Sequence, residues 1–161
     1  MNLNPNSTTY SKPEDHSWLR SKADTEFGVS ITLDATKFGS TPFPGLIVRS
    51  GTLLGKVTAS GKYGPYKSDA SDGTQTPIGF LLATIDLTQG GLVVAGADSP
   101  ASLLWRGAIV AAKVPQGTGA SSTTPGAIDT ATGPALTTLT GSAPYTLPTA
   151  LIEFRARFLF T

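Results

Sequence analysis

The chain has 161 residues, enough for one domain with a buried core, and its 12 Lys and Arg face 11 Asp and Glu, for a formal net charge of +1. Charged residues make up only 14% of the chain, which argues against a nucleic-acid or anionic-membrane surface. The absence of Cys excludes disulfides and thiolate metal sites. The 18 Gly and 12 Pro lack a collagen-like period and are typical of short strands joined by turns.

Residues 1–22 are polar and rich in Asn, Ser and Thr. This composition predicts an N-terminal arm that is flexible when free. Trp18 and Leu19 are large apolar groups inside this segment, so we expect them to pack either on the chain's own domain or on a partner. The segment has no basic stretch followed by an apolar run, so we expect no secretory signal and a soluble product made in the cytosol.

Residues 27–38 alternate, with Val29, Ile31 and Leu33 on one face, which predicts a half-buried strand. A Gly- and Pro-rich loop follows, and residues 46–48 are expected to form a short strand. Residues 51–86 place short apolar runs between turn residues and predict several more strands. The boundaries of these strands are expected at Gly64-Pro65, Asp72-Gly73 and Pro77.

Two apolar runs at 92–95 and 103–114 indicate further strands, although residues 99–105 also fit one helical turn. Residues 116–148 form a Gly-, Thr- and Pro-rich tract, expected to be an insertion, an edge hairpin or a mobile loop. Residues 150–161 alternate again and predict a closing strand. Its buried face would carry alternate residues, namely Ile152, Phe154, Ala156, Phe158 and Phe160.

The count of seven to nine short strands with little helix predicts an all-β (mainly β) fold, a small barrel or sandwich. We expect residues 1–22 to be the arm and residues 23–161 to be a single β-rich domain. No fixed internal period is visible, which argues against a solenoid or propeller.

The sequence offers no convincing catalytic or metal-binding constellation. His16 lies beside Glu14 and Asp15, but no second His or Cys could complete a metal site, and no nucleophile elbow is present for a hydrolase triad. Residues 69–72 faintly match a calcium loop but lack the bidentate Glu that should follow. We therefore predict a protein that is not an enzyme and has no metal or cofactor.

Some exposed aromatic residues could serve binding instead. Tyr63, Tyr66 and Trp105 could stack on sugars, so a carbohydrate-binding or adhesive β-sandwich remains an alternative. The Trp105-Arg106 pair is of the kind enriched in interface hot spots and could anchor a subunit contact, although core packing explains Trp105 equally well.

Five segments resemble the head decoration proteins of tailed bacteriophages. They are SWLRS at 17–21, SITLD at 30–34, SGTLLGKVTASGKYGPY at 50–66, SDGTQTPIGFLL at 71–82 and RGAIVAAKVP at 106–115. The ordered series is what carries the resemblance, since single glycines would carry none. The C-terminal third, from residue 117 on, extends beyond the shorter members of that family.

The resemblance implies a barrel-like β protein that forms a homotrimer on the outer surface of the expanded phage head. It would sit at three-fold and quasi-three-fold positions and clamp neighbouring major capsid proteins, with no nucleic-acid or membrane partner. The family's arm is disordered in solution and ordered on the shell. On that basis the expected capsid contacts are Tyr10, Pro13, Trp18 and Leu19, and the candidate trimer contacts are Trp105 and Arg106.

Overall fold

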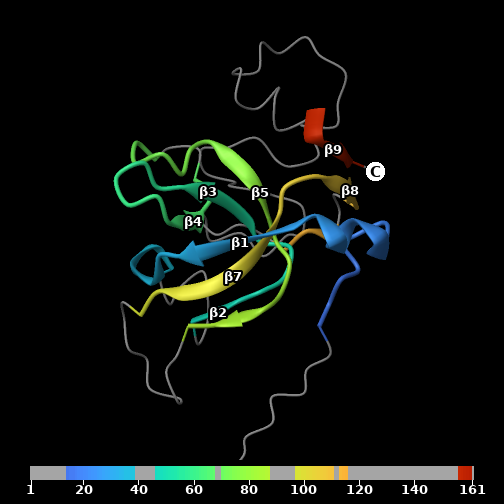
Figure 1. Ribbon diagram of the computed structural model, residues 1–161, viewed down its shortest axis with the longest axis horizontal. Helices are drawn as coiled ribbons and strands as arrows, with labels where there is room; N and C mark the ends of the chain where they lie inside the picture. Colours follow the sequence, from blue (N-terminus) through green and yellow to red (C-terminus); the bar gives the residue numbers. More distant parts are fainter. Residues whose placement is uncertain are drawn as a thin grey trace, which may run out of the picture.

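The computed structural model describes residues 14–38, 46–67, 70–87, 97–110, 113–115 and 156–160, without the side chains of residues 24 and 160. Nine strands and two short 3₁₀ helices lie within these ranges (Figure 1). No helix in these ranges is long and apolar enough to cross a membrane.

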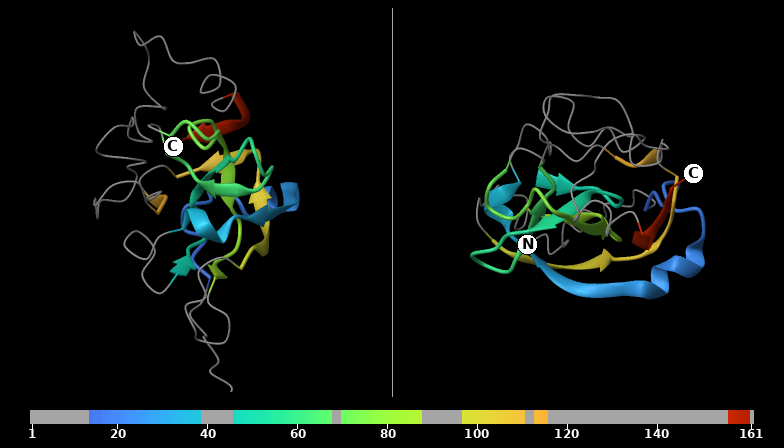
Figure 2. Two further views of the ribbon diagram at one scale, coloured as in Figure 1. Left: turned by 90° about the vertical axis from the view of Figure 1, so that its left-hand side faces the viewer. Right: turned by 90° about the horizontal axis from the view of Figure 1, so that it is seen from above.

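Five strands form a closed barrel. In the order of their pairing around it they are β1 (Gly28–Leu33), β4 (Tyr63–Pro65), β3 (Leu53–Lys56), β5 (Pro77–Leu81) and β7 (Ser99–Leu104). β1 and β7 run antiparallel along six residue pairs, from Gly28↔Leu104 to Leu33↔Ser99, and Figure 2 shows these two long ribbons side by side. A single parallel pair, Leu33↔Tyr63, joins β1 to β4 and closes the barrel.

Two smaller sheets and two 3₁₀ helices complete the described fold. β2 (Ile47–Val48) pairs antiparallel with β6 (Ile85–Asp86), and β8 (Gly107–Ile109) pairs parallel with β9 (Phe158–Phe160). The helix η1 (Lys22–Phe27) leads into β1, and η2 (Ala35–Lys37) follows it.

The core has two apolar clusters, and neighbouring residues of the central strands belong to different clusters. Leu54, Leu81 and Leu103 lie in one with the β1 residues Ile31 and Leu33. The preceding or following residues of the same strands lie in the other, namely Leu53, Phe80 and Leu104. β3, β5 and β7 are therefore covered on both faces, which explains why they carry adjacent large apolar residues instead of strict alternation.

The second cluster is completed by residues from outside the barrel. Trp18 and Leu19 come from the segment before η1, Ile109 from β8, Val114 from the segment after it and Phe158 from β9. Phe158 meets Phe80 edge-on, with ring centroids 5.1 Å apart and an interplanar angle of 86°. Segments near both ends of the chain therefore cover the same face of the barrel.

The all-β prediction is confirmed, and the turn at Asp72-Gly73 is found where predicted. Gly73 adopts φ +107°, a conformation that favours glycine. Residues 99–104 form strand β7, so the alternative of a helical turn there is wrong. Its pairing with both β1 and β5 outweighs any local helical preference.

The predicted break at Gly64-Pro65 is also wrong, because both residues belong to β4. Pro65 faces Leu54 in the β3–β4 ladder, while Tyr66 N–H donates to Leu53 O and Val57 N–H donates to Lys62 O. Leu54↔Pro65 is thus a non-hydrogen-bonded pair of this antiparallel ladder. The ladder requires no N–H at Pro65, so the proline costs no hydrogen bond there.

Other sequence predictions hold in part. Ile31 and Leu33 are buried as expected, but Val29 at the start of β1 is 47% exposed. In the closing segment Phe158 is buried and Leu159 is exposed, as the alternation requires, but Ala156 is also exposed and precedes the strand. Residues 92–95, 116–148 and 150–155 lie outside the described residues.

Candidate functional site

Trp18 lies inside the domain, not on a free arm. Its side chain is 1% exposed, its ring centroid is 5.7 Å from that of Phe80, and its indole Nε1–H donates to Ser50 Oγ at 2.9 Å. The hydroxyl of Ser50 in turn donates to Leu82 O at 3.0 Å. The buried indole N–H is thus satisfied by a side chain that is itself buried and bonded.

Backbone contacts fix the same segment to β8. Leu19 forms an isolated antiparallel bridge with Ile109. Val110 N–H donates to Trp18 O at 2.8 Å, and Arg20 N–H donates to Ala108 O at 3.0 Å. Residues 18–20 therefore extend the β8–β9 sheet by one short strand-like segment.

The docking continues back to the first described residue. Glu14 Oε1 accepts hydrogen bonds from both the backbone N–H (2.6 Å) and the hydroxyl (2.8 Å) of Thr84. His16 Nε2 lies 2.9 Å from Leu82 O. Contacts at residues 14, 16 and 18–20 thus hold this segment against the body.

This placement changes the role expected of the apolar arm residues. Trp18 and Leu19 pack on their own domain, which is one of the two arrangements the sequence allowed, and they could touch a capsid only by leaving the core. Tyr10 and Pro13, the other two expected capsid contacts, lie outside the described residues.

Trp105 and Arg106 lie together on the surface between β7 and β8. Trp105 is 37% exposed. The guanidinium carbon of Arg106 lies 3.8 Å from the ring centroid of Phe27 and 5.2 Å from that of Trp105. Stacking on two aromatic rings restricts the Arg106 side chain, which otherwise has several rotatable bonds.

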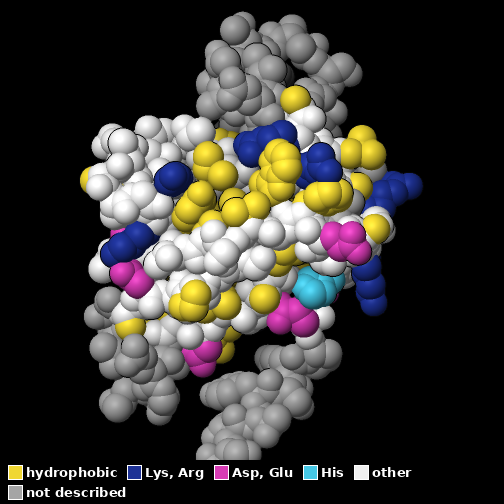
Figure 3. All heavy atoms as spheres, in the orientation of Figure 1, with side chains coloured by type: hydrophobic (Ala, Val, Ile, Leu, Met, Phe, Trp, Pro, Cys, Tyr) yellow, Lys and Arg dark blue, Asp and Glu magenta, His cyan; other side chains and the backbone are white. Residues whose placement is uncertain are grey.

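A shallow open concavity of about 410 Å³ lies beside this pair. Its lining combines arginine with apolar side chains, and Leu159 on its rim is 64% exposed. The lining residues come from the end of η1, the start of β8 with the residue before it, and the C-terminal segment, namely Phe27, Arg106, Gly107, Ala156, Arg157, Phe158 and Leu159. Figure 3 shows hydrophobic and basic side chains next to one another on the face that carries these elements.

Sequence reasoning missed Phe27 and Leu159 as members of this surface. Phe27 was expected only as the first residue of a strand, and nothing in its spacing pointed to Arg106. Leu159 was predictable in principle, because it alternates with Phe158 and so had to face outward if Phe158 faced inward.

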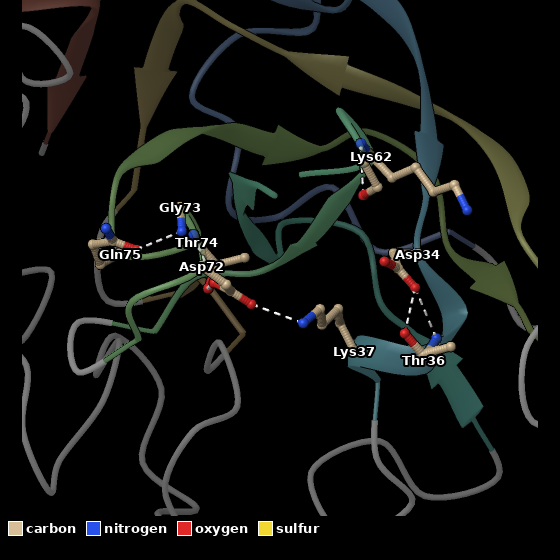
Figure 4. A network of polar contacts seen from close by, with 9 residues as sticks. Asp34, Thr36, Lys37, Lys62, Asp72, Gly73, Thr74 and Gln75 are labelled. Atoms are coloured by element: carbon tan, nitrogen blue, oxygen red, sulfur yellow. Dashed lines mark hydrogen bonds and ion pairs between the residues drawn. The ribbon is translucent and has the colours of Figure 1, made fainter. Parts of the chain in front are cut away.

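The Asp72 turn has a structural explanation. Asp72 Oδ1 accepts from the backbone N–H (3.0 Å) and the hydroxyl (2.6 Å) of Thr74, and its Oδ2 lies 2.8 Å from Lys37 Nζ (Figure 4). The hydrogen bond from Lys37, followed by those from Thr74, holds the pKa of the Asp72 carboxyl well below its usual range. The same contact raises the pKa of Lys37. This carboxylate fixes the turn between β4 and β5 and links it to η2.

The other candidate residues do not converge on one site. Tyr66 is 2% exposed, so it offers no ring to a sugar. Tyr63 pairs with Leu33 at one end of β1, whereas Trp105 follows Leu104, which pairs with Gly28 at the other end. Among the described residues, no group of three or more His, Cys, Asp or Glu is placed to hold a metal ion.

The comparison with protein families identifies the chain's relatives. The model of the family described as bacteriophage lambda head decoration protein D matches residues 31–120, more than half of the chain. The chain belongs to this family. It is a phage head decoration protein, a structural component of the virion capsid. The resemblance seen in the sequence is thus confirmed. No curated protein and no solved structure matches the chain.

The match covers part of the described fold of this decoration protein. It begins within β1 and runs past β8, so it contains most of the barrel. It leaves out Trp18, Leu19, η1 and β9. The residues that cover the second core cluster from the two ends of the chain therefore lie mainly outside the matched region.

Proposed function

We propose that this decoration protein binds the outer surface of the expanded phage head as a homotrimer. It occupies three-fold and quasi-three-fold positions and clamps neighbouring major capsid proteins together. The single observation that carries the proposal is the family match over residues 31–120, which implies association with the phage capsid. The protein is made in the host cytoplasm before it joins the virion.

The clamp works by binding alone. If residues 1–13, including Tyr10 and Pro13, contact the capsid, three such segments on one trimer bind together. Linked binding events raise avidity by about 10² to 10⁴ when the geometry allows simultaneous engagement. A surface that binds only expanded capsomers stabilises the expanded state by mass action.

The packing of residues 14–20 supports two separate roles within the N-terminal segment. Trp18 and Leu19 anchor the N-terminal segment to its own body, and the residues before Glu14 are left to contact the capsid. The buried indole of Trp18 and the two hydrogen bonds accepted by Glu14 connect these capsid-binding residues firmly to the barrel.

Deletion of residues 1–13 tests this proposal. The truncated protein keeps every contact of the docked segment, so we expect it to fold and self-associate like the full chain. Its occupancy on purified expanded capsids should fall by at least about tenfold, because the loss of one weak contact per subunit is multiplied across the trimer. Occupancy equal to that of the full chain would assign capsid binding to the body.

None of the contacts described for the residues that the structure covers favours a carbohydrate-binding function. The three aromatic residues expected to form a stacking platform are separated along β1 or buried. We therefore propose no second function.

A further inference from the structure

The concavity at the start of β8 carries two arginines and no acidic residue. Arg106 and Arg157 both line it, and none of its lining residues is Asp or Glu. Leu159 on its rim and Trp105 beside Arg106 are among the large hydrophobic residues that the described part of the chain exposes. Arginine and large apolar side chains on one exposed patch are typical of interface hot spots. We call this patch, formed by Phe27, Trp105, Arg106, Arg157 and Leu159, the two-arginine surface.

Aromatic rings restrict the orientation of Arg106. Its guanidinium carbon lies 3.8 Å from the ring centroid of Phe27 and 5.2 Å from that of Trp105. The two ion pairs found within the described ranges, Lys37–Asp72 and Lys62–Asp98, do not involve it. Stacking on a ring uses the flat face of the guanidinium. Its N–H donors lie in the plane of the group and therefore remain accessible to a carboxylate.

The two lining arginines give this surface a positive charge. Arg157, in the segment before β9, is half-buried and adds its charge to that of Arg106. The adjoining residues 20–26 contribute no net charge, because they include two basic and two acidic residues, namely Arg20, Lys22, Asp24 and Glu26. Lys22 and Glu26 are exposed, and neither lines the concavity. A binding partner for this surface should therefore be negatively charged.

The chemistry of the surface favours an acidic protein segment as that partner. The same surface of a second copy would bring arginines against arginines, so the surface is not complementary to itself. A nucleic acid would need a longer basic track than two arginines on a chain of net charge +1. A small free anion would leave Phe27 and Leu159 uncovered. A peptide with a carboxylate beside an apolar side chain matches both the charged and the apolar part.

We propose that the two-arginine surface binds an acidic segment of the major capsid protein. A carboxylate of that segment pairs with Arg106 and Arg157, and a neighbouring apolar side chain packs on Phe27 and Leu159. Arginine and carboxylate form bidentate hydrogen bonds, which fix the orientation of such a contact. The inference rests on the proposed function, because it takes the capsid as the partner. It adds a contact on the body to the one proposed for residues 1–13.

Binding to purified expanded heads tests this contact in the full-length protein. We expect Arg106→Glu and Arg157→Glu each to raise the apparent dissociation constant by at least about tenfold, because each places a like charge opposite the carboxylate. Arg106→Lys keeps the charge but loses the planar group, so it should weaken binding less than Arg106→Glu. Raising NaCl from about 50 to about 300 mM should weaken wild-type binding more than that of Arg106→Glu. Co-sedimentation with heads over a concentration series measures each value.

Matched controls separate the contact from general effects. Arg49→Glu makes the same change of charge at an exposed residue between β2 and β3, outside the two-arginine surface, and should leave head binding unchanged. Without heads, the reversal variants should sediment like the wild type and unfold within about 3 °C of it. Where a reversal unfolds the protein, Gln at the same position replaces it and should weaken head binding by at least about threefold.

The proposal is overturned if both reversals bind heads as tightly as the wild type, or if Arg49→Glu weakens binding as much as they do. Reversals that change self-association without heads would assign the arginines to a contact between copies, and Gln variants that also unfold would assign them to the fold. Either result overturns the proposal too. In all these cases wild-type protein on the heads leaves the decoration proposal standing, whereas heads that stay bare with wild-type protein overturn both.

Discussion

The indole N–H of Trp18 donates a 2.9 Å hydrogen bond to the hydroxyl of Ser50, which is 32 residues further along the chain. Ser50 donates onward to Leu82 O, which also lies 2.9 Å from His16 Nε2. Three segments are thus joined at one buried carbonyl. The N-terminal segment therefore contributes to the stability of the folded domain.

The Trp18–Ser50 hydrogen bond gives the first prediction. Ser50→Ala leaves a buried indole N–H without an acceptor and should lower the free energy of unfolding by about 1–3 kcal/mol. In a Trp18→Phe background the donor is absent. The loss of unfolding free energy caused by Ser50→Ala should therefore be smaller there than in the wild type, by about 1 kcal/mol or more. Urea unfolding of the two single variants and the double variant measures this coupling. Strictly additive effects would show that the hydrogen bond does not contribute.

Phe158 and Leu159 form a matched pair for testing β9. Phe158 is 5% exposed and meets Phe80 edge-on, so Phe158→Ala should lower the free energy of unfolding by about 3–5 kcal/mol. Leu159 is 64% exposed, and Leu159→Ala should change it by no more than about 0.5 kcal/mol in dilute protein. Equal losses at both positions would contradict the placement of β9 on the second core cluster.

The sequence predicted the barrel strands well because their apolar residues and turns are local signals. β3 and β5 lie where the apolar runs and the Asp72-Gly73 turn predicted them, whereas β1 ends at Leu33 and not at residue 38, because the helix η2 follows it. The segment at 18–19 was harder, because its two large residues sit among polar neighbours and either a partner or the domain itself could cover them. The adjacent apolar pairs in β3, β5 and β7 were the available clue, since strands covered on both faces require additional covering residues.

The surroundings of Trp105 and Arg106 show the limit of sequence reasoning more clearly. Residue type alone indicated that Trp105 and Arg106 could anchor a subunit contact, and core packing explained Trp105 equally well. Their partners Phe27 and Leu159 come from positions far away in the chain, and only the β8–β9 pairing and the contacts of η1 bring them together. No spacing rule encodes such long-range contacts.

Asp72 predicts a specific dependence of stability on pH. Its pKa in the folded protein lies below the ordinary value of 3.8, so its contribution is present above about pH 3.8 and is lost as the pH falls toward the folded pKa. Asp72→Asn should lower the free energy of unfolding by roughly 1 kcal/mol at pH 7, a size typical of a solvent-accessible pair. The difference from wild type should shrink between pH 3.8 and pH 2. Urea unfolding at both ends of this range would contradict the account if the difference grew.

Gly51 and Gly61 both have positive φ but differ in their surroundings. Gly51 has φ +84°, and a Cβ there would lie 2.9 Å from Trp18 Cγ and 2.8 Å from Pro115 Cδ. Gly61 has φ +72°, and a Cβ there would meet only Lys56 Cε at 4.0 Å. Gly61→Ala should cost about 1 kcal/mol of unfolding free energy through its backbone, and Gly51→Ala about 1–3 kcal/mol more through collision with the indole. Thermal unfolding compares the two, and equal costs would show that Trp18 can move aside.

Imaging of decorated capsids tests the central claim most directly. Purified expanded heads that lack decoration are mixed with the full-length protein, and their structure is determined by electron cryomicroscopy. The account predicts three-lobed density on the outer surface at three-fold and quasi-three-fold positions, with each lobe accommodating one barrel. Heads that remain bare in the presence of folded, self-associated protein would contradict it.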